Sequence, residues 1–248
     1  MHKFLHLFFV LVSLNSLAQT PSPMPAKVIL QQQSAWLGYF NQTRISNKIG
    51  LWVDLHHRRT DFATRPFQEL ARLGLTYYLA DNVRLTAGYA IVGTHLYPSG
   101  TIRPEHRPWQ QIWWTGRVSR LNITQYIRTE QRFNRRISGD QLIDGYGFNW
   151  RFRYSLLCQI PLWGAANVRP GVPNFVVQDE VFINAGKQIT VNTFDQNRFF
   201  VGVSYPFNKH LTGQLGYMNL FQQQPSGSTY TSNQTMRFFL FHTLDLRE

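Results

Sequence analysis

Cysteine is nearly absent from this chain, and acidic residues are scarce. The 248 residues include a single cysteine, Cys158, which excludes an internal disulfide framework and a zinc site built from several thiolates. Only 15% of the residues are charged, but 15% are aromatic and 43% hydrophobic, which excludes wholesale disorder. The chain has 13 acidic residues and 25 basic ones, and 20 of the basic residues are arginine. Because arginine suits fixed, paired or partly buried positions, this basic balance does not first indicate a nucleic-acid surface.

Long apolar runs are absent beyond the N-terminus. Lys3 precedes a short apolar stretch (4–14), and the small residues Ser16 and Ala18 occupy the positions that a signal peptidase reads. This pattern predicts a secretory signal peptide, which is too short to span a bilayer as a mature helix. The predicted organisation is a signal peptide at 1–18, a Pro- and Gln-rich leader at 19–33 that could hold the first strand, and a single barrel domain at 34–248.

The rest of the chain alternates between apolar and polar residues with a period of two. Phe152, Tyr154 and Leu156, for example, alternate with Arg151 and Arg153. In an extended chain this pattern gives one apolar and one polar face, and it predicts an all-β protein. The expected strands lie near 34–45, 49–59, 67–79, 83–95, 107–118, 122–133, 146–158, 174–184, 197–206, 210–221 and 235–246.

The length of these strands separates two architectures. A tilted strand needs about 9–11 residues to cross a bilayer, whereas strands of soluble sheets average about 5–6 residues. Short polar turns such as 46–48 alternate with longer loops such as 96–106 and 134–145, which is typical of outer-membrane barrels. A secreted β-sandwich is the alternative, but its polar face tends to be rich in Lys, Glu and Thr. The mean hydropathy of −0.28 is compatible with a barrel, since half of each strand would face the lumen.

We therefore expect a closed antiparallel transmembrane β-barrel with short periplasmic turns and long extracellular loops. Closure of such a barrel requires an even number of strands, but the pattern gives eleven. Residues 27–33 (KVILQQQ) are the only candidate for a further strand. The expectation is about twelve strands, or ten if two of the segments are not strands.

Several segments of the chain resemble a known family. They are RTEQRF (128–133), NWRFRYSL (149–156), QDEVFINAGK (178–187), FDQNRFFVGVSY (194–205) and LGYMN (215–219). They are similar to the bacterial family called domain of unknown function 2490, which is common in Bacteroidetes. The resemblance covers roughly residues 34–246, and it implies an exported outer-membrane β-barrel of a Gram-negative bacterium. It implies no reaction.

Charged residues on the polar rows are expected to point into the barrel, because an arginine on the lipid face near the midplane costs about 2–4 kcal/mol. Arginine–carboxylate pairs could then cross-link neighbouring strands as a structural ladder. Unpaired arginines would instead leave a positive lumen that attracts anions. The residues expected to face the lumen are Asp54, Arg58, Arg72, Arg84, Arg128, Glu130, Arg132, Arg151, Arg153, Glu180 and Arg198.

The sequence contains few patterns that are typical of an enzyme active site. No histidine stands in an His-x-Ser pair, which on a strand would put a base and a nucleophile side by side. His56 and His57 are adjacent, so on a strand they point to opposite faces and cannot hold one metal ion. Cys158 is in phase with an apolar row and is expected to act as an apolar residue. We expect no catalytic residue, no metal and no cofactor.

Two functions fit these expectations. The first is a narrow channel with a basic lumen that prefers small anionic solutes. The second is a closed structural or surface-binding barrel whose arginine–carboxylate ladder fills the lumen. Outer-membrane lipid and lipopolysaccharide are the expected partners, with Arg103, Arg107, Arg135 and Arg136 as candidate contacts for lipopolysaccharide phosphates. Nucleic acid is not an expected partner.

Overall fold

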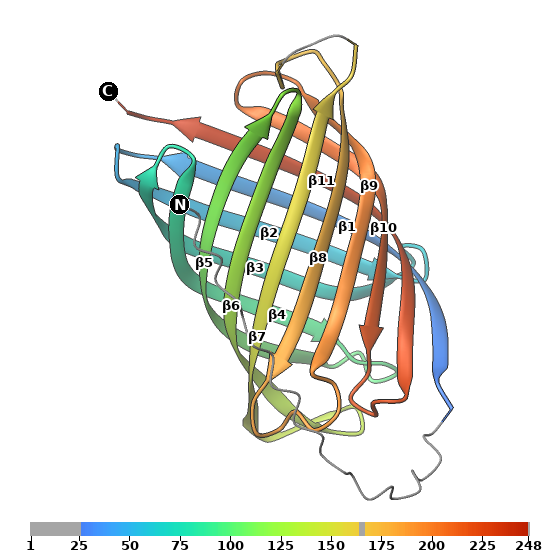
Figure 1. Cartoon of the computed structure of the whole chain (residues 1–248). Coiled ribbons are helices and arrows are strands. Elements are labelled where there is room, and N and C mark those ends of the chain that lie inside the picture. The colour runs from blue at the N-terminus through green and yellow to red at the C-terminus, as the bar shows by residue number, and fades with distance from the viewer. Residues whose placement is uncertain (1–25, 164–166, 248) are drawn as a thin grey trace, which may run out of the picture.

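Eleven β-strands and their connections make up the computed structural model, which describes residues 26–163 and 167–247. The strands pair in chain order, and the last closes onto the first, so the sheet forms a barrel of tilted strands (Figure 1). Across the described ranges, no helix has the length and apolarity needed to span a membrane. The strands are β1 (Val28–Arg44), β2 (Ile49–Thr60), β3 (Arg65–Ala80), β4 (Val83–His95), β5 (Ile102–Val118), β6 (Leu121–Ser138), β7 (Gln141–Pro161), β8 (Asn174–Ala185), β9 (Phe194–Pro206), β10 (Leu211–Gln223) and β11 (Thr229–Asp245).

The barrel closes differently from the antiparallel prediction. Residues 28–33 are the first part of β1 and form no strand of their own, so the prediction of about twelve strands is wrong, and the described residues form eleven. With an odd number of strands, the first and the last run in the same direction. β1 and β11 accordingly pair in parallel, from Val28 opposite Thr229 to Arg44 opposite Asp245. The predicted signal peptide and residues 19–25 of the predicted leader lie outside the described residues.

The connections between strands do not alternate in length as predicted. One end of the barrel, the Asp81 rim, carries the turns at 45–48, 81–82, 119–120 and 207–210, together with the 162–173 connection. The opposite end, the Gly139 rim, carries the connections at 61–64, 96–101, 139–140, 186–193 and 224–228. The expected loop at 134–145 is instead a hairpin, because Gly139 has a φ of 60° that permits a two-residue turn. The prediction of a long loop at 134–145 is therefore wrong.

Ion pairs hold the end of the parallel seam to a neighbouring turn. Arg44 at the end of β1 lies 2.7 Å from Asp81, and Arg247 beyond β11 lies 3.7 Å from the same carboxylate. The hydrogen bond from Arg44 holds the pKa of Asp81 below its usual value. Both strands of the seam are thus tied to the turn between β3 and β4.

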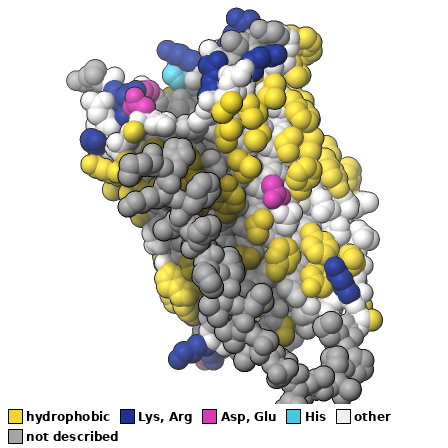
Figure 2. Space-filling view, in the orientation of Figure 1, with side chains coloured by type: hydrophobic (Ala, Val, Ile, Leu, Met, Phe, Trp, Pro, Cys, Tyr) yellow, Lys and Arg dark blue, Asp and Glu magenta, His cyan; other side chains and the backbone are white. Residues whose placement is uncertain are grey.

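The barrel has an apolar outside and a polar inside. Leu73, Leu75 and Tyr77 on β3 are all exposed, whereas Arg72 and Thr76 on the same strand are buried. The same alternation runs through the other strands. Figure 2 shows hydrophobic side chains spread over much of the visible outer wall. The usual arrangement of a globular protein is therefore inverted, with polar and charged residues forming most of the interior.

Paired glycines make room for large aromatic rings inside the barrel. Gly74 on β3 lies opposite Gly88 on β4, and a Cβ on Gly74 would come within 2.8 Å of the Trp109 ring. Gly202 and Gly216 form a second such pair between β9 and β10. Aromatic side chains that cover strand glycines in this way help to fix the curvature and register of barrels.

Gly88→Val should prevent or strongly weaken folding. The new Cβ would overlap the carbonyl oxygen of Leu73 and lie 2.6 Å from the Cα of Gly74, and backbone cannot yield as a flexible side chain can. Overpacking of this kind costs about 1–3 kcal/mol or more. The urea midpoint of the refolded protein in detergent should fall accordingly.

Gly116→Val is the matched control, because a Cβ at Gly116 has no atom within 4 Å. It should keep the midpoint of the original protein. Equal midpoints for the two variants would contradict the close packing at the glycine pair.

Candidate functional site in the barrel interior

The centre of the barrel interior is a carboxylate surrounded by arginines. Glu130 on β6 is fully buried. Arg151 and Arg153 from β7 approach its oxygens to 2.5 Å and 2.8 Å. Arg107 on β5 lies 3.6 Å away, and Arg72 on β3 reaches to 3.8 Å. One carboxylate therefore links four strands, β3, β5, β6 and β7.

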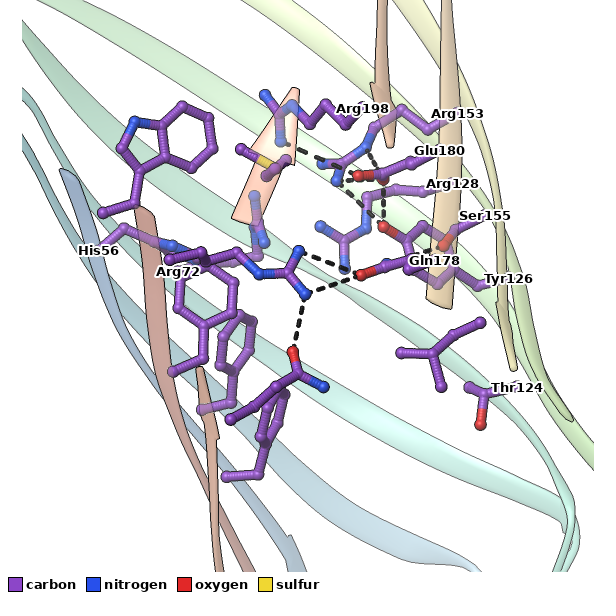
Figure 3. Close-up of a pocket in the computed structure, with 18 of the residues that line it drawn as sticks. His56, Arg72, Thr124, Tyr126, Arg128, Arg153, Ser155, Gln178, Glu180 and Arg198 are labelled. Atoms are coloured by element: carbon purple, nitrogen blue, oxygen red, sulfur yellow. Dashed lines mark hydrogen bonds and ion pairs between the residues drawn. The ribbon is translucent and has the colours of Figure 1, made fainter. Parts of the chain in front are cut away.

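A second carboxylate extends this network toward β8 and β9. Glu180 on β8 accepts two hydrogen bonds from Arg153, at 2.9 Å and 2.5 Å, and lies 3.9 Å from Arg198 on β9 (Figure 3). The hydroxyl of Tyr126 on β6 also donates to Glu180. Arg153 thus bridges Glu130 and Glu180 and belongs to both groups.

Two further acidic groups lie closer to the Gly139 rim. Glu105 on β5 receives a hydrogen bond of 2.8 Å from Arg107 and two, of 2.7 Å and 3.0 Å, from Arg132 on β6. Asp195 on β9 lies 3.3 Å from Arg151. These pairs continue the charged network along the barrel axis.

Asp54 on β2 forms a separate group on the other side of the interior. It is fully buried and accepts hydrogen bonds from Arg72 at 2.9 Å and from the indole nitrogen of Trp52 at 2.6 Å. The Nε2 atom of His56 lies 3.2 Å from its second oxygen. Because Arg72 also approaches Glu130, it connects Asp54 to the central network.

Three interior arginines have amide partners instead of carboxylates. Among the residues that the structure describes, no ion pair joins Arg58, Arg128 or Arg237 to an acidic side chain. A neutral amide oxygen satisfies a donor but leaves the positive charge uncompensated. The partners are Gln68 Oε1 for Arg58 at 2.7 Å, Gln111 Oε1 for Arg128 at 2.8 Å, and Gln178 Oε1 and Gln214 Oε1 for Arg237 at 3.1 Å and 2.7 Å.

The interior consequently carries a positive charge. Within 26–163 and 167–247, nine arginines that are buried or line the cavity face five buried carboxylates. The arginines are Arg58, Arg72, Arg107, Arg128, Arg132, Arg151, Arg153, Arg198 and Arg237, and the carboxylates are Asp54, Glu105, Glu130, Glu180 and Asp195.

A cavity of about 440 Å³ lies beside these arginines. Its wall includes Arg58, Arg128 and Arg198, and also apolar residues such as Met218 and Phe239. The apolar part belongs to a cluster inside the barrel beneath β8–β11 and β1. That cluster consists of Trp36, Val176, Phe200, Met218, Leu220 and Phe239.

The comparison with known families gives one result. A family model described as "Protein of unknown function (DUF2490)" matches residues 33–231. The chain belongs to this family. No curated protein and no solved structure matches it. The DUF2490 match includes all five interior carboxylates, whereas Arg237 lies beyond its C-terminal limit.

The structure places the eleven charged residues expected in the lumen on the inner face of the DUF2490 barrel. Ten of them join the network or line the cavity: Asp54, Arg58, Arg72, Arg128, Glu130, Arg132, Arg151, Arg153, Glu180 and Arg198. Arg84 stands apart near the Asp81 rim, where its guanidinium lies 2.9 Å from the centroid of the Trp113 ring. It does not line the cavity.

Sequence reasoning missed four members of the interior network. Glu105 and Asp195 fall in segments that the pattern predicts to be loops, and Arg107 is predicted to contact lipopolysaccharide. That prediction for Arg107 is wrong, because it is buried against Glu105. Arg237 is in phase with Phe239 on β11, so its row resembles an apolar outer face. Extending the alternation of β5 back from Trp109 places Arg107 and Glu105 on the same inward row, and this would have identified both residues.

Glu130→Gln should destabilise the barrel by about 3–5 kcal/mol, because removing one partner of a buried ion pair leaves uncompensated charge behind. Four arginines would lose their shared carboxylate. The measurement is the urea midpoint of the refolded protein in detergent micelles.

Asp144→Asn is the control, since Asp144 forms an ion pair with Arg135 but is fully exposed. Its midpoint should stay unchanged, because exposed pairs contribute little. A Glu130→Gln variant as stable as this control would show that the network is not needed for folding.

Proposed function

We propose that this protein is a membrane-spanning β-barrel of a Gram-negative outer membrane. The inverted distribution of side chains supports the proposal. Leu55, Leu73 and Ile91, among many outward residues, are at least half exposed, while most of the buried side chains are polar or charged. Such a surface would be unfavourable in water and is the surface expected against lipid. All strands have at least 12 residues, more than the ~9–11 that a tilted strand needs to cross.

We further propose that the barrel is a narrow channel with a basic lumen that prefers anions. The excess of interior arginines over carboxylates is the observation that carries this proposal. An eleven-stranded barrel falls between eight-stranded barrels, which side chains fill, and sixteen-stranded porins, which hold water. Ion pairs occupy part of the interior, so the remaining pathway is narrow and runs beside uncompensated cations.

The proposal includes no reaction and no cofactor. Among the described histidines, His56 is the one buried inside the barrel, and its Nε2 atom faces Asp54. Its Nδ1 atom has no hydrogen-bond partner among the described residues, so no hydroxyl or thiol is held against it as a nucleophile. Lipopolysaccharide remains the proposed partner at the Gly139 rim, through Arg103, Arg135 and Arg136.

A closed structural barrel is the second candidate. It is favoured by contacts that cross the interior between strands that are not neighbours. Arg237 on β11 reaches Gln178 on β8, and Arg72 on β3 reaches Glu130 on β6. If these contacts persist in the membrane, the interior would be a packed core through which no ion passes.

Current through a planar bilayer tests the channel. The refolded mature protein should give a steady conductance with a preference for chloride over potassium. Arg128→Gln should lower the chloride-to-potassium permeability ratio by about sixfold, because a unit positive charge ~8 Å away stabilises chloride and destabilises potassium by about 0.5 kcal/mol each in a water-like medium. Arg128 is chosen because no carboxylate loses a partner when it is replaced.

Arg59→Gln is the matched control for this substitution. Arg59 alternates with the inward Arg58 and donates to the backbone oxygens of Ala63 and Thr64. The ratio should not change in this variant. A folded and inserted protein that carries no current would reject the channel and favour the closed barrel.

A further inference from the structure

The cavity inside the barrel has two chemically different walls. One wall carries guanidinium groups, including those of Arg58, Arg198 and Arg237. The other is apolar and is formed by side chains from β1, β7, β10 and β11. Its members are Trp36, Phe40, Leu157, Met218, Leu220, Phe239 and Phe241. A pathway for hydrated inorganic ions requires no apolar wall of this extent.

Trp36 joins the two walls. The guanidinium carbon of Arg58 lies 4.0 Å from the centroid of its ring, and that of Arg198 lies 5.0 Å from the same centroid. Both cations therefore lie within reach of one small ligand. The indole belongs at the same time to the apolar cluster that contains Met218 and Phe239.

Several donors at this place have no partner. The Nε atoms of Arg58, Arg198 and Arg237 are buried, and the described part of the chain offers none of them a hydrogen bond. Among the described residues, Arg198 forms an ion pair only with Glu180, at 3.9 Å, and Arg153 already engages that carboxylate at 2.5 Å. A buried unsatisfied donor is costly, and more so when it is charged. Because these Nε atoms have almost no accessible surface, a ligand carboxylate would instead accept charge-assisted hydrogen bonds from the terminal guanidinium nitrogens of the same cavity-lining arginines.

The volume of the cavity suits a small organic molecule. About 440 Å³ lies within the range of 300–1,000 Å³ that is usual for ligand pockets. Such pockets are mostly apolar, with a few polar groups that fix the orientation of the ligand. Here the apolar wall would cover the body of the ligand, and the arginines would hold its charged end.

We propose that this cavity is a binding site for organic monocarboxylates with an apolar body. The carboxylate lies against Arg58 and Arg198, and the body packs on Trp36, Met218 and Phe239. This inference deepens the proposed function and rests on it for its place in the cell, because it names organic anions as the solutes that the basic lumen selects. The binding itself can be measured on the folded barrel without a membrane.

The experiment is calorimetric titration of the refolded mature protein in nonionic detergent with 2-naphthoate. Two further probes separate the parts of the ligand: acetate has the carboxylate without the body, and naphthalene-2-methanol has the body without the charge. One 2-naphthoate should bind per barrel, and each of the other probes should bind at least about tenfold more weakly. Titration into detergent alone corrects for partition into micelles.

Arg58→Gln and Arg198→Gln should each raise the dissociation constant of 2-naphthoate at least about tenfold, since each removes a charge-assisted hydrogen bond. Neither substitution leaves a carboxylate without an arginine, so the barrel should still fold, and its heat-shifted gel mobility verifies this. Arg84→Gln is the control, because Arg84 is an inward arginine that does not line the cavity. It should bind 2-naphthoate as the original protein does.

Each result decides the inference. Binding of 2-naphthoate that the Arg58 and Arg198 variants do not weaken would overturn it, and so would acetate binding of equal strength. A chloride current without 2-naphthoate binding would overturn this inference and leave the channel standing. Specific binding by a barrel that carries no current would support the site and reject the channel.

Discussion

An arginine inside a packed barrel must find a counter-charge or a strong acceptor, because burying an unpaired ion costs several kcal/mol. Glu130 meets this need for four strands at once. Arg153 connects Glu130 to Glu180, and Arg72 connects Glu130 to Asp54. The polar interior is therefore one linked structure and not a row of independent pairs. The inverted barrel depends on it, since its apolar residues face outward and only part of the interior has an apolar cluster.

The carboxylates of this network do not neutralise every interior arginine, and the arginines without a carboxylate partner line one cavity. The central arginines share carboxylates, whereas Arg58, Arg128 and Arg237 have glutamine amides. These three line the cavity and have the apolar cluster nearby. Structural pairing and anion attraction, which are alternatives for a whole lumen, thus occur side by side, because Arg153 and Glu180 of the ladder line the same cavity as these three arginines. The ladder fixes the strands, and the unpaired arginines give the cavity its chemistry.

Much of this architecture can be read from the sequence, and what cannot has physical reasons. Alternation locates all eleven strands, because each has one apolar and one polar face. Alternation does not reveal how the barrel closes, because the residue pattern of a strand does not specify which other strand it pairs with. Arg237 escapes detection because its row also carries Phe239 and Phe241, which pack inside the barrel. Glu105 and Asp195 escape because β5 begins at Ile102 and β9 at Phe194, before the predicted starts at 107 and 197.

The parallel seam between β1 and β11 has a consequence for topology. In a barrel with an even number of strands, both chain ends emerge at the same rim. Here β1 begins at the Gly139 rim, while β11 ends at the Asp81 rim. In a membrane the start of β1 and the end of β11 would therefore face opposite sides. Gain or loss of whole hairpins changes strand number by two, so eleven strands cannot be reached from an even-numbered barrel without the gain or loss of a single strand.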